Sequence, residues 1–524
     1  MVLQSNLHDT KEKIICQKKL LALLLALLMT VPFTVSCGKQ PDKNQNYGET
    51  NKNKDEAGLD EDVDPLIPVI NEYVDELAST YNFKGKTFNW MGTVGWQAPE
   101  VEDETGNTAD DAMYFRQREI EEKFGLDWQN ITAPGAGAGD AISPTVELIR
   151  QDVMAGTGAY SVSYAPNMQT QLLLINDTLM NLTDFSTLDL ERPWWQKDLY
   201  DIYGMGGEMY FLTGPIVTWF YEDVICMVYN KQVAEDYRIT GLYDLVRNKE
   251  WTFDKMLEVA SVIPENANGS GAWRFAGIDG MAVTLAHGHE ITSFDEDGKP
   301  YLTDSLPQSF IDIADKYSKI FGDDTLTINT KWLTVSSGEP FDSKYGYGSA
   351  TGMFEEDRML FYMISAGRVS DLREVDVDFG ILPVPMGYAD QDEYISYAGD
   401  GMNVFVPKSS KDVEMADVIL EAMAALGYKY FKPTFYDKML KSRTVKDYES
   451  KDMLDIIFAS KKYDIIDIID KGANLNTDGE IVNFYKGVIQ ESSHGMVSKY
   501  FIKSKTVNNN IKMILSNIEA DLGN

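Results

Sequence analysis

The motif His287-Gly288-His289-Glu290 has residue types that bind metal ions. A zinc protease places two histidines at i and i+4 of one helix, so that both face the same ion. The two histidines here have the spacing i, i+2, and the chain has only two more, His8 and His494. We therefore predict no metal site.

Other short motifs resemble binding loops or catalytic turns but lack essential parts. Asp295-Glu296-Asp297-Gly298 lacks the ligand spacing and the final Glu of a calcium loop, so we interpret it as a hairpin turn. Gly135, Gly137 and Gly139 alternate with Ala, but no Gly-Lys-Ser/Thr follows to cradle a phosphate. Gly-x-Ser-x-Gly is also absent. We predict no catalytic residues and no cofactor.

Composition narrows the class of protein further. The 524 residues are 44% hydrophobic and 25% charged, which is typical of globular proteins with two or three domains. Acidic residues number 82 and basic residues 47, giving a formal charge of -35. Such a chain is a poor match for phosphate-rich partners, so we expect no nucleic-acid binding. Three cysteines exclude a disulfide-rich scaffold and a cysteine-bound cluster.

The N-terminus has the parts of a secretory signal. Four lysines between positions 11 and 19 precede the apolar run Leu20–Val31, and Thr34-Val35-Ser36-Cys37 follows. This order resembles a bacterial lipoprotein signal, although Thr34 stands where Leu is usual. We predict a signal peptide at 1–36 and lipid attachment at Cys37. An uncleaved membrane anchor is the alternative, and the uncharged span is barely long enough for it.

Residues 37–64 contain few apolar side chains and are expected to form a flexible tether. The body would then lie at the extracellular face of the cytoplasmic membrane, held by the lipid. Cys226 lies in an apolar stretch and is expected to be a small buried side chain rather than a reactive thiol.

Strand and helix patterns alternate along the body of the chain. Thr87–Met91 and Ala159–Ser163 are predicted strands, and Ala112–Phe124 is a predicted helix between them. This alternation favours a parallel sheet covered by helices. Later predictions are helices after the caps Thr252 and Ser305, strands at 377–381 and 402–406, and a helix at 413–426 ended by Gly427.

Several of these segments occur in an order that resembles family 1 of the extracellular solute-binding proteins, the sugar-binding lipoproteins of ABC importers. The similar segments are MYFLTG at 209–214, ICMVYNK at 225–231, Trp251-Thr252-Phe253-Asp254, Gly298-Lys299-Pro300, the region 378–385, and Gly399-Asp400-Gly401. Thr and Trp are exchanged relative to the family in the third of these. The similarity extends from about residue 84 to 425.

The resemblance implies an α/β fold of the two-lobed periplasmic-binding-protein-like kind (type II), with discontinuous lobes joined by a hinge. Lobe one would comprise 84–211 plus 351–396, and lobe two 214–350 plus 397–524. A carbohydrate would bind in the cleft between them without being altered. The partners implied are this ligand and an ABC permease in the membrane, and we expect a monomer.

A neutral sugar presents an apolar C–H face to an aromatic ring and hydroxyls to polar side chains at the rim. Aromatic residues in loops after strands, and an aspartate between two glycines, are therefore the candidate ligand-binding residues: Trp96, Tyr164, Trp219, Tyr221, Trp273, Trp332 and Asp400. Trp194-Trp195 is expected to pack beneath a loop. If the sugar is acidic, Arg358 or Arg368 is a candidate to bind its carboxylate.

Two other functions fit the sequence. A secreted glycoside hydrolase needs two carboxylates about 5 to 9.5 Å apart, and the many acidic residues leave this open. A binding lipoprotein for a non-sugar solute, such as a peptide, would differ only in its ligand.

Overall fold

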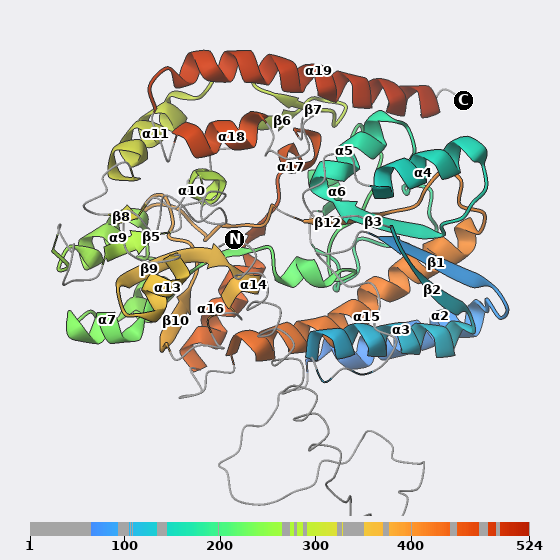
Figure 1. Ribbon diagram of the computed structural model, residues 1–524, viewed down its shortest axis with the longest axis horizontal. Coiled ribbons are helices and arrows are strands. Elements are labelled where there is room, and N and C mark those ends of the chain that lie inside the picture. Colours follow the sequence, from blue (N-terminus) through green and yellow to red (C-terminus); the bar gives the residue numbers. More distant parts are fainter. Residues whose placement is uncertain are drawn as a thin grey trace, which may run out of the picture. The chain divides into compact units, whose positions relative to one another are not determined.

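The computed structural model (Figure 1) describes most of the chain after residue 63. The residues described are 64–522 with the exception of 93–103, 105, 107, 134–143, 197–198, 265–272, 277–279, 287–290, 322–326, 329–349, 370–371, 373–376, 400, 441–447, 471–479 and 489–492.

The first sheet contains four strands in the order β12-β3-β1-β2. Its strands are β1 (Thr87–Gly92), β2 (Asp127–Thr132), β3 (Val162–Pro166) and β12 (Met402–Phe405). β1 is parallel to β2 and β3, whereas β12 is antiparallel to β3. The chain returns between the parallel strands through α3 (Thr108–Phe124) and α4 (Pro144–Ala155), as a parallel sheet requires.

The second sheet contains five strands in the order β10-β4-β9-β5-β8. They are β4 (Ile225–Asn230), β5 (Trp273–Ala276), β8 (Thr327–Ile328), β9 (Met359–Ser365) and β10 (Phe379–Leu382). β4 is antiparallel to β9 and β10, and β5 is parallel to β9 and β8.

This pairing corrects the expected division of the chain after residue 350. β9 and β10 were expected in lobe one but pair in the second sheet, while β12 was expected in lobe two but pairs with β3. β9 has the sequence MLFYMIS and is almost entirely buried, which suits a central strand of either sheet. Its own pattern therefore does not select the sheet that it joins.

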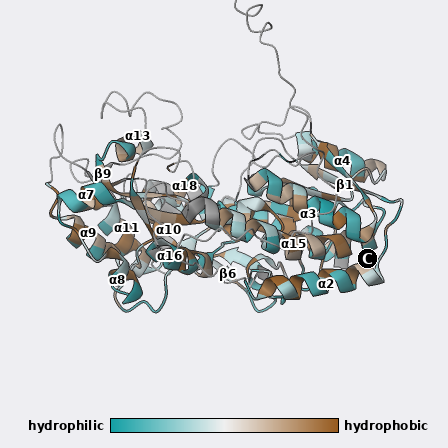
Figure 2. Cartoon of the chain, turned by 90° about the horizontal axis from the view of Figure 1, so that it is seen from below, coloured by the Kyte–Doolittle hydropathy of each residue, from teal (hydrophilic) through white to brown (hydrophobic). Residues whose placement is uncertain are grey.

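Helices cover both sheets (Figures 1 and 2). Those nearest the first sheet are α2 (Leu66–Thr80), α3, α4, α5 (Asn167–Ile175), α6 (Leu199–Tyr203) and part of α15 (Val413–Leu440). Those following strands of the second sheet include α7 (Lys231–Asp236), α8 (Leu242–Arg247), α9 (Phe253–Ala260), α10 (Gly280–Ala286), α11 (Gln308–Phe321), α13 (Ala350–Glu355) and α14 (Ala366–Val369). The C-terminal helices are α16 (Tyr448–Ala459), α17 (Ile466–Ile469), α18 (Glu480–Lys486) and α19 (Met496–Leu522).

Local signals set several helix boundaries. The hydroxyl of Thr252 accepts a hydrogen bond from the backbone N–H of Lys255 at 3.1 Å, which confirms the predicted N-cap of α9. The turn between β6 (Thr292–Phe294) and β7 (Pro300–Leu302) is closed by Asp295, whose carboxylate accepts from the backbone N–H groups of Asp297 and Lys299. The acidic motif there is thus the predicted hairpin turn.

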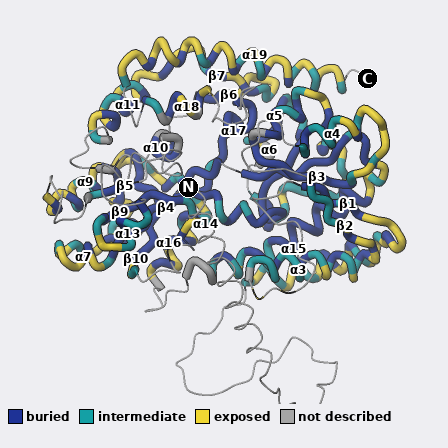
Figure 3. The backbone as a smooth tube through the Cα atoms, viewed as in Figure 1, coloured by how far each residue is buried: buried dark blue, intermediate teal, exposed yellow. Residues whose placement is uncertain are grey.

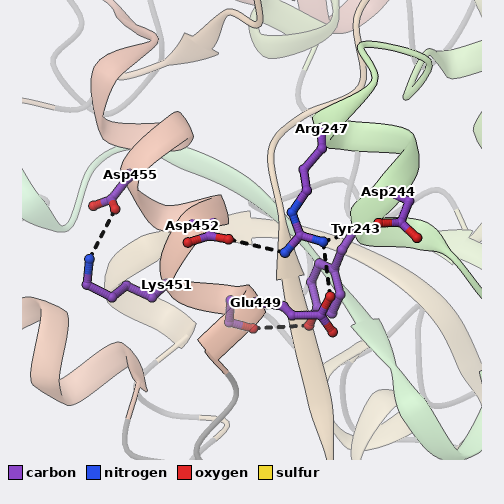
Figure 4. A network of polar contacts seen from close by, with 8 residues as sticks. Tyr243, Asp244, Arg247, Glu449, Lys451, Asp452 and Asp455 are labelled. Carbon is purple, nitrogen blue, oxygen red and sulfur yellow. Dashed lines mark hydrogen bonds and ion pairs between the residues drawn. The ribbon is translucent and has the colours of Figure 1, made fainter. Parts of the chain in front are cut away.

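An arginine on α8 holds the start of α16 against the second sheet's helices (Figure 4). Arg247 contacts Glu449 and Asp452, each at 3.1 Å, and Asp244 at 3.3 Å. The neighbouring Tyr243 hydroxyl lies 3.1 Å from the hydroxyl of Ser450. The Arg247 side chain is about one-third exposed, so these ion pairs position α16 more than they stabilise it.

In the described part of the chain, three segments that are hydrogen-bonded to one another cross between the two sheets. The first, residues 211–224, starts beside β12 with Leu212 paired to Val404 and ends beside β4 with Val224 paired to Ala398. The second, residues 396–404, starts with β11 (Ser396–Tyr397) and continues into β12. The third, residues 459–466, contains β13 (Lys461–Lys462), which is parallel to β11, and leads from α16 to α17. The segments lie side by side because each is hydrogen-bonded to another.

Buried residues form one core that runs through both sheets and the crossing segments (Figure 3). Cys226 in β4 is 1% exposed, and burial raises the pKa of its thiol to about 12. This confirms the expectation of an inert buried side chain.

Candidate ligand-binding site

The end of β3 lies next to the second crossing segment, and the end of β9 lies next to the first. In a parallel α/β sheet, ligands bind beyond the carboxyl ends of the strands. The residues directly after β3 and β9 are Asn167 and Ala366, which begin α5 and α14. Asn167 contacts the second crossing segment and Ala366 the first.

Asn167 holds Gly399 and Gly401 of the second crossing segment in place. Its side-chain amide donates to the carbonyl of Gly399 at 2.6 Å, and its backbone N–H donates to the carbonyl of Gly401 at 3.2 Å. Asn403 in turn donates to the side-chain oxygen of Asn167 at 2.7 Å. A side chain at position 399 would overlap the hydroxyl of Tyr397, so glycine is required there.

A partly exposed group of side chains lies where the first crossing segment meets α14. Trp219 and Glu222 are half-buried, in and directly after the 3-10 turn η1 (Thr218–Tyr221), and Arg368 on α14 is exposed. The two elements are in contact: Gly367 donates its N–H to the carbonyl of Glu222 at 3.0 Å, and Ala366 to that of Val224 at 2.8 Å. We call Trp219, Glu222 and Arg368 the crossing-segment patch. It combines an aromatic ring, a carboxylate acceptor and a guanidinium donor.

A buried ion pair, formed by the residue that follows Glu222, joins the first and third crossing segments. The ammonium of Lys461 lies 3.4 Å from a carboxylate oxygen of Asp223, and both side chains are at most 1% exposed. The ammonium also donates to the carbonyl of Phe220 and to the hydroxyl of Tyr463, and it lies 3.5 Å from the centre of the Phe220 ring. Burial lowers the pKa of Lys461 to about 8, although Asp223 opposes this shift.

Asp223 also approaches Gly401 of the second crossing segment. A Cβ atom built on Gly401 would lie 3.8 Å from the second carboxylate oxygen of Asp223 and 3.5 Å from Asn167. Gly399 and Gly401 thus lie beside buried polar groups from the start of α5 and from the first crossing segment. Neither Asn167, Asp223 nor Lys461 was predicted, because an isolated polar residue gives no sequence signal that distinguishes it from a surface residue.

Two predicted ligand-binding residues belong to the core instead. Tyr164 is fully buried in β3 and stacks on Trp90 with ring centres 4.9 Å apart. Tyr221 is 3% exposed and stacks on Phe435 of α15 at 5.7 Å. Because protein side chains cover the faces of both rings, neither ring can stack on a sugar. The predictions that Tyr164 and Tyr221 bind the ligand are therefore wrong.

The remaining candidates divide into three groups. Trp219 lies in the crossing-segment patch. Trp273 is the first residue of β5, where it pairs with Met359. Trp96, Trp332, Asp400 and the predicted lipidation site Cys37 lie outside the described residues, as does the motif at 287–290.

The two candidate arginines differ in exposure. Arg368 is exposed and belongs to the patch, whereas Arg358 lies half-buried directly before β9, with its backbone N–H bonded to Met353. Position therefore favours Arg368 over Arg358 as a residue that contacts a ligand.

Trp194 and Trp195 have the structural role expected of them. Both are buried, and their indole N–H groups donate to Glu421 of α15 at 2.8 and 3.1 Å. Burial raises the pKa of Glu421 to about 7, against the lowering effect of these donors.

A cavity of about 510 Å³ lies at another place, against β13. It is lined by residues of α6, of β6, of the segment 393–395 and of the third crossing segment. None of the patch residues lines it. Over the described part of the chain, no cluster of three or more His, Cys, Asp or Glu is arranged to hold a metal ion. Within the same residues no helix is both long and apolar enough to span a membrane.

Comparison with known proteins identifies the fold. No family model and no curated protein matches the sequence. Solved structures do match: the GacH receptor of Streptomyces glaucescens, studied with acarbose, has a TM-score of 0.52 at 12% identity. The galacto-N-biose/lacto-N-biose I-binding protein of an ABC transporter from Bifidobacterium longum has a TM-score of 0.52 at 13% identity. An ABC substrate-binding protein from Listeria monocytogenes, in complex with cycloalternan, has a TM-score of 0.50 at 11% identity.

Each comparison covers 82% of this chain and 99% of the matched chain. The resemblance predicted from the sequence is thus confirmed at the level of the fold. The chain has the two-lobed α/β fold of the sugar-binding proteins of ABC transporters, with lobes that are discontinuous in sequence.

Proposed function

We propose that this protein is the substrate-binding component of an ABC importer, that it captures a carbohydrate between its lobes, and that it delivers the carbohydrate to a permease. The observation that carries the proposal is the crossing-segment patch. An aromatic ring, a carboxylate and a guanidinium are carried by two elements in backbone contact, the first crossing segment and α14 at the end of β9. Side chains of these types suit the apolar face and the hydroxyls of a sugar ring.

The fold supports this proposal, since the three structural neighbours are reported with cycloalternan, acarbose or lacto-N-biose. All three ligands contain more than one ring, and we propose an oligosaccharide here as well. We also propose that the protein is secreted and anchored through lipid on Cys37, because the N-terminal sequence has the basic, apolar and cysteine parts of a lipoprotein signal.

The direct test is a thermal-shift screen of oligosaccharides and peptides against the purified full chain. A ligand that binds the folded state raises the melting temperature by mass action. We expect stabilisation by one class of oligosaccharide. Stabilisation by peptides alone would replace the carbohydrate by another solute, and release of shorter sugars during incubation would identify a hydrolase.

Trp219→Ala tests the location of the site. Loss of a stacked indole is expected to weaken the affinity for the oligosaccharide found in the screen about tenfold or more, measured by titration calorimetry. Tyr301→Ala removes an exposed ring from β7 and serves as the matched control. Equal affinities for the two variants would mean that the ligand binds away from the patch.

A further inference from the structure

The C-terminal helix α19 has one buried face and one outward face of unusual composition. Tyr500, Val507, Ile511, Ile514 and Ile518 are buried, and their spacing places them on one side of the helix. This side contacts α5, α17, α18 and β7. The opposite side is exposed along much of the helix (Figure 3).

Large apolar side chains on the outward face are exposed. Val497, Phe501, Ile502 and Met513 are 51, 52, 68 and 48% exposed, respectively. Three of them lie within the first two turns of the helix. Single exposed apolar residues are ordinary, but a group on one helix face indicates a surface that is covered in use.

From residue 492 to residue 518 the charged residues of this face are all lysines, and the exposed Glu519 that follows is paired with Lys299. Residues 492–518 include Lys499, Lys503, Lys505 and Lys512 but no Asp or Glu, in a chain with 82 acidic and 47 basic residues. Lys499, Lys505 and Lys512 are exposed, and Lys503 forms an ion pair with Glu480 of α18. The ammonium of Lys505 lies 3.9 Å from the centre of the Phe501 ring, so basic and apolar groups alternate at close range.

We propose that this outward face of α19 binds the surface of an anionic lipid bilayer. Lysine ammonium groups attract acidic headgroups, and rings and aliphatic side chains beside them enter the boundary between headgroups and acyl chains. The rest of a chain with net charge -35 is repelled by the same surface. The α19 face therefore selects the orientation in which the protein approaches a membrane.

Charge and shape favour lipid over a protein partner as the occupant. The four apolar side chains stand out from a convex helix, and none of them lines the cavity of about 510 Å³. Long lysine side chains around them match a planar layer of diffuse negative charge. The inference does not depend on the carbohydrate, since α19 carries none of the patch residues.

The first experiment compares vesicles of phosphatidylcholine with vesicles that also contain phosphatidylglycerol. The full chain carries Cys16→Ser and Cys37→Ser, so that it forms one unlipidated species. It is sedimented with each kind of vesicle. The triple variant Lys499→Gln, Lys505→Gln, Lys512→Gln is expected to lose affinity for the anionic vesicles by tenfold or more. Lys84→Gln, Lys319→Gln, Lys451→Gln changes the net charge equally elsewhere on exposed positions and is the matched control.

A second experiment reports the contact locally, because the basic, apolar N-terminus is also expected to bind lipid in every variant. An environment-sensitive dye is attached to Asn509→Cys on the outward face, in the same double-serine background, where Cys226 is buried. We expect a blue shift with anionic vesicles, and none for a dye on Lys319→Cys. No shift at position 509 overturns the proposal and leaves a protein partner as the occupant of this face.

Discussion

Lys461 is a lysine whose charge is held entirely inside the protein. Its ammonium is surrounded by the rings of Phe220, Phe458 and Tyr463 and has Asp223 as its counter-charge. A buried pair of this kind adds little stability compared with two apolar residues, but removal of one partner leaves an uncompensated charge. The pair thus requires that the first and third crossing segments remain together.

Lys461→Met is expected to destabilise the protein by about 3 to 5 kcal/mol, because Asp223 would then be buried without its cation. Asp223→Asn in the same chain should recover part of this loss. Urea denaturation measures the free energies, and Lys462→Met on the same short strand is the control. If the single variant is as stable as the control, the two charges are not coupled.

Glu421 gives a pH dependence with a defined sign. Its pKa in the folded protein is about 7, above its ordinary value of 4.5, so between these values the folded state holds a proton that the unfolded state has lost. Folding is therefore favoured by this group as the pH falls from about 7 to about 4.5. Relative to Glu421→Gln, the wild type should gain up to about 3 kcal/mol over this range in urea denaturation. A relative loss on acidification would mean that the two indole donors outweigh burial.

At the scale of the residue, the sequence predicted buried packing residues better than it predicted ligand-binding residues. Trp194-Trp195 and Cys226 are buried as expected. Tyr164 was placed after a strand predicted at 159–163, but β3 extends from Val162 to Pro166, so the ring lies within the strand. Tyr221 stacks on Phe435, which is far away in the sequence, and no local pattern reveals such a contact.

At the scale of the element, α15 shows how tertiary contacts override a local signal. Gly427 was predicted to end a helix at 426, yet α15 continues to Leu440. A side chain at position 427 would overlap the carbonyl oxygen of Pro215 in the first crossing segment. The glycine is thus a point of close packing rather than a C-cap, and the prediction of the helix end is wrong.

Gly427→Ala is therefore expected to destabilise the protein by about 3 kcal/mol, although alanine is the better helix former. Gly487→Ala, near the end of α18, places its new methyl group in open space and should change the stability by less than about 1 kcal/mol. Thermal or urea unfolding of both variants measures the difference. Equal stabilities would show that α15 moves away from Pro215 at no cost.

At the scale of the whole molecule, the three crossing segments described above connect two sheets, which is the arrangement for rotation about a hinge. A ligand held between the lobes should shift the population toward the closed form. We expect the radius of gyration from X-ray scattering to decrease on addition of the oligosaccharide that stabilises the protein, and Trp219→Ala to require more ligand for the same change. Binding without compaction would contradict closure.

The two-lobed fold could be predicted from the order of motifs, because each strand and turn is specified locally. The division of the chain between lobes could not, since β9 and β12 have apolar patterns that suit either sheet. The buried ion pair depends on Lys461 and Asp223, which meet only after the third crossing segment returns beside the first.

α19 also constrains movement between the lobes. Near its start the hydroxyl of Tyr500 donates to the carbonyl of Thr303 at 2.6 Å, ahead of α11. Near its end the amide of Asn517 donates to the carbonyl of Ile175 at 2.8 Å, at the end of α5. A single continuous helix is thus hydrogen-bonded to segments of both lobes. If the lobes move apart, α19 must either bend or lose its contacts at one end. The weaker of the two sets of contacts therefore contributes to how far the lobes can open.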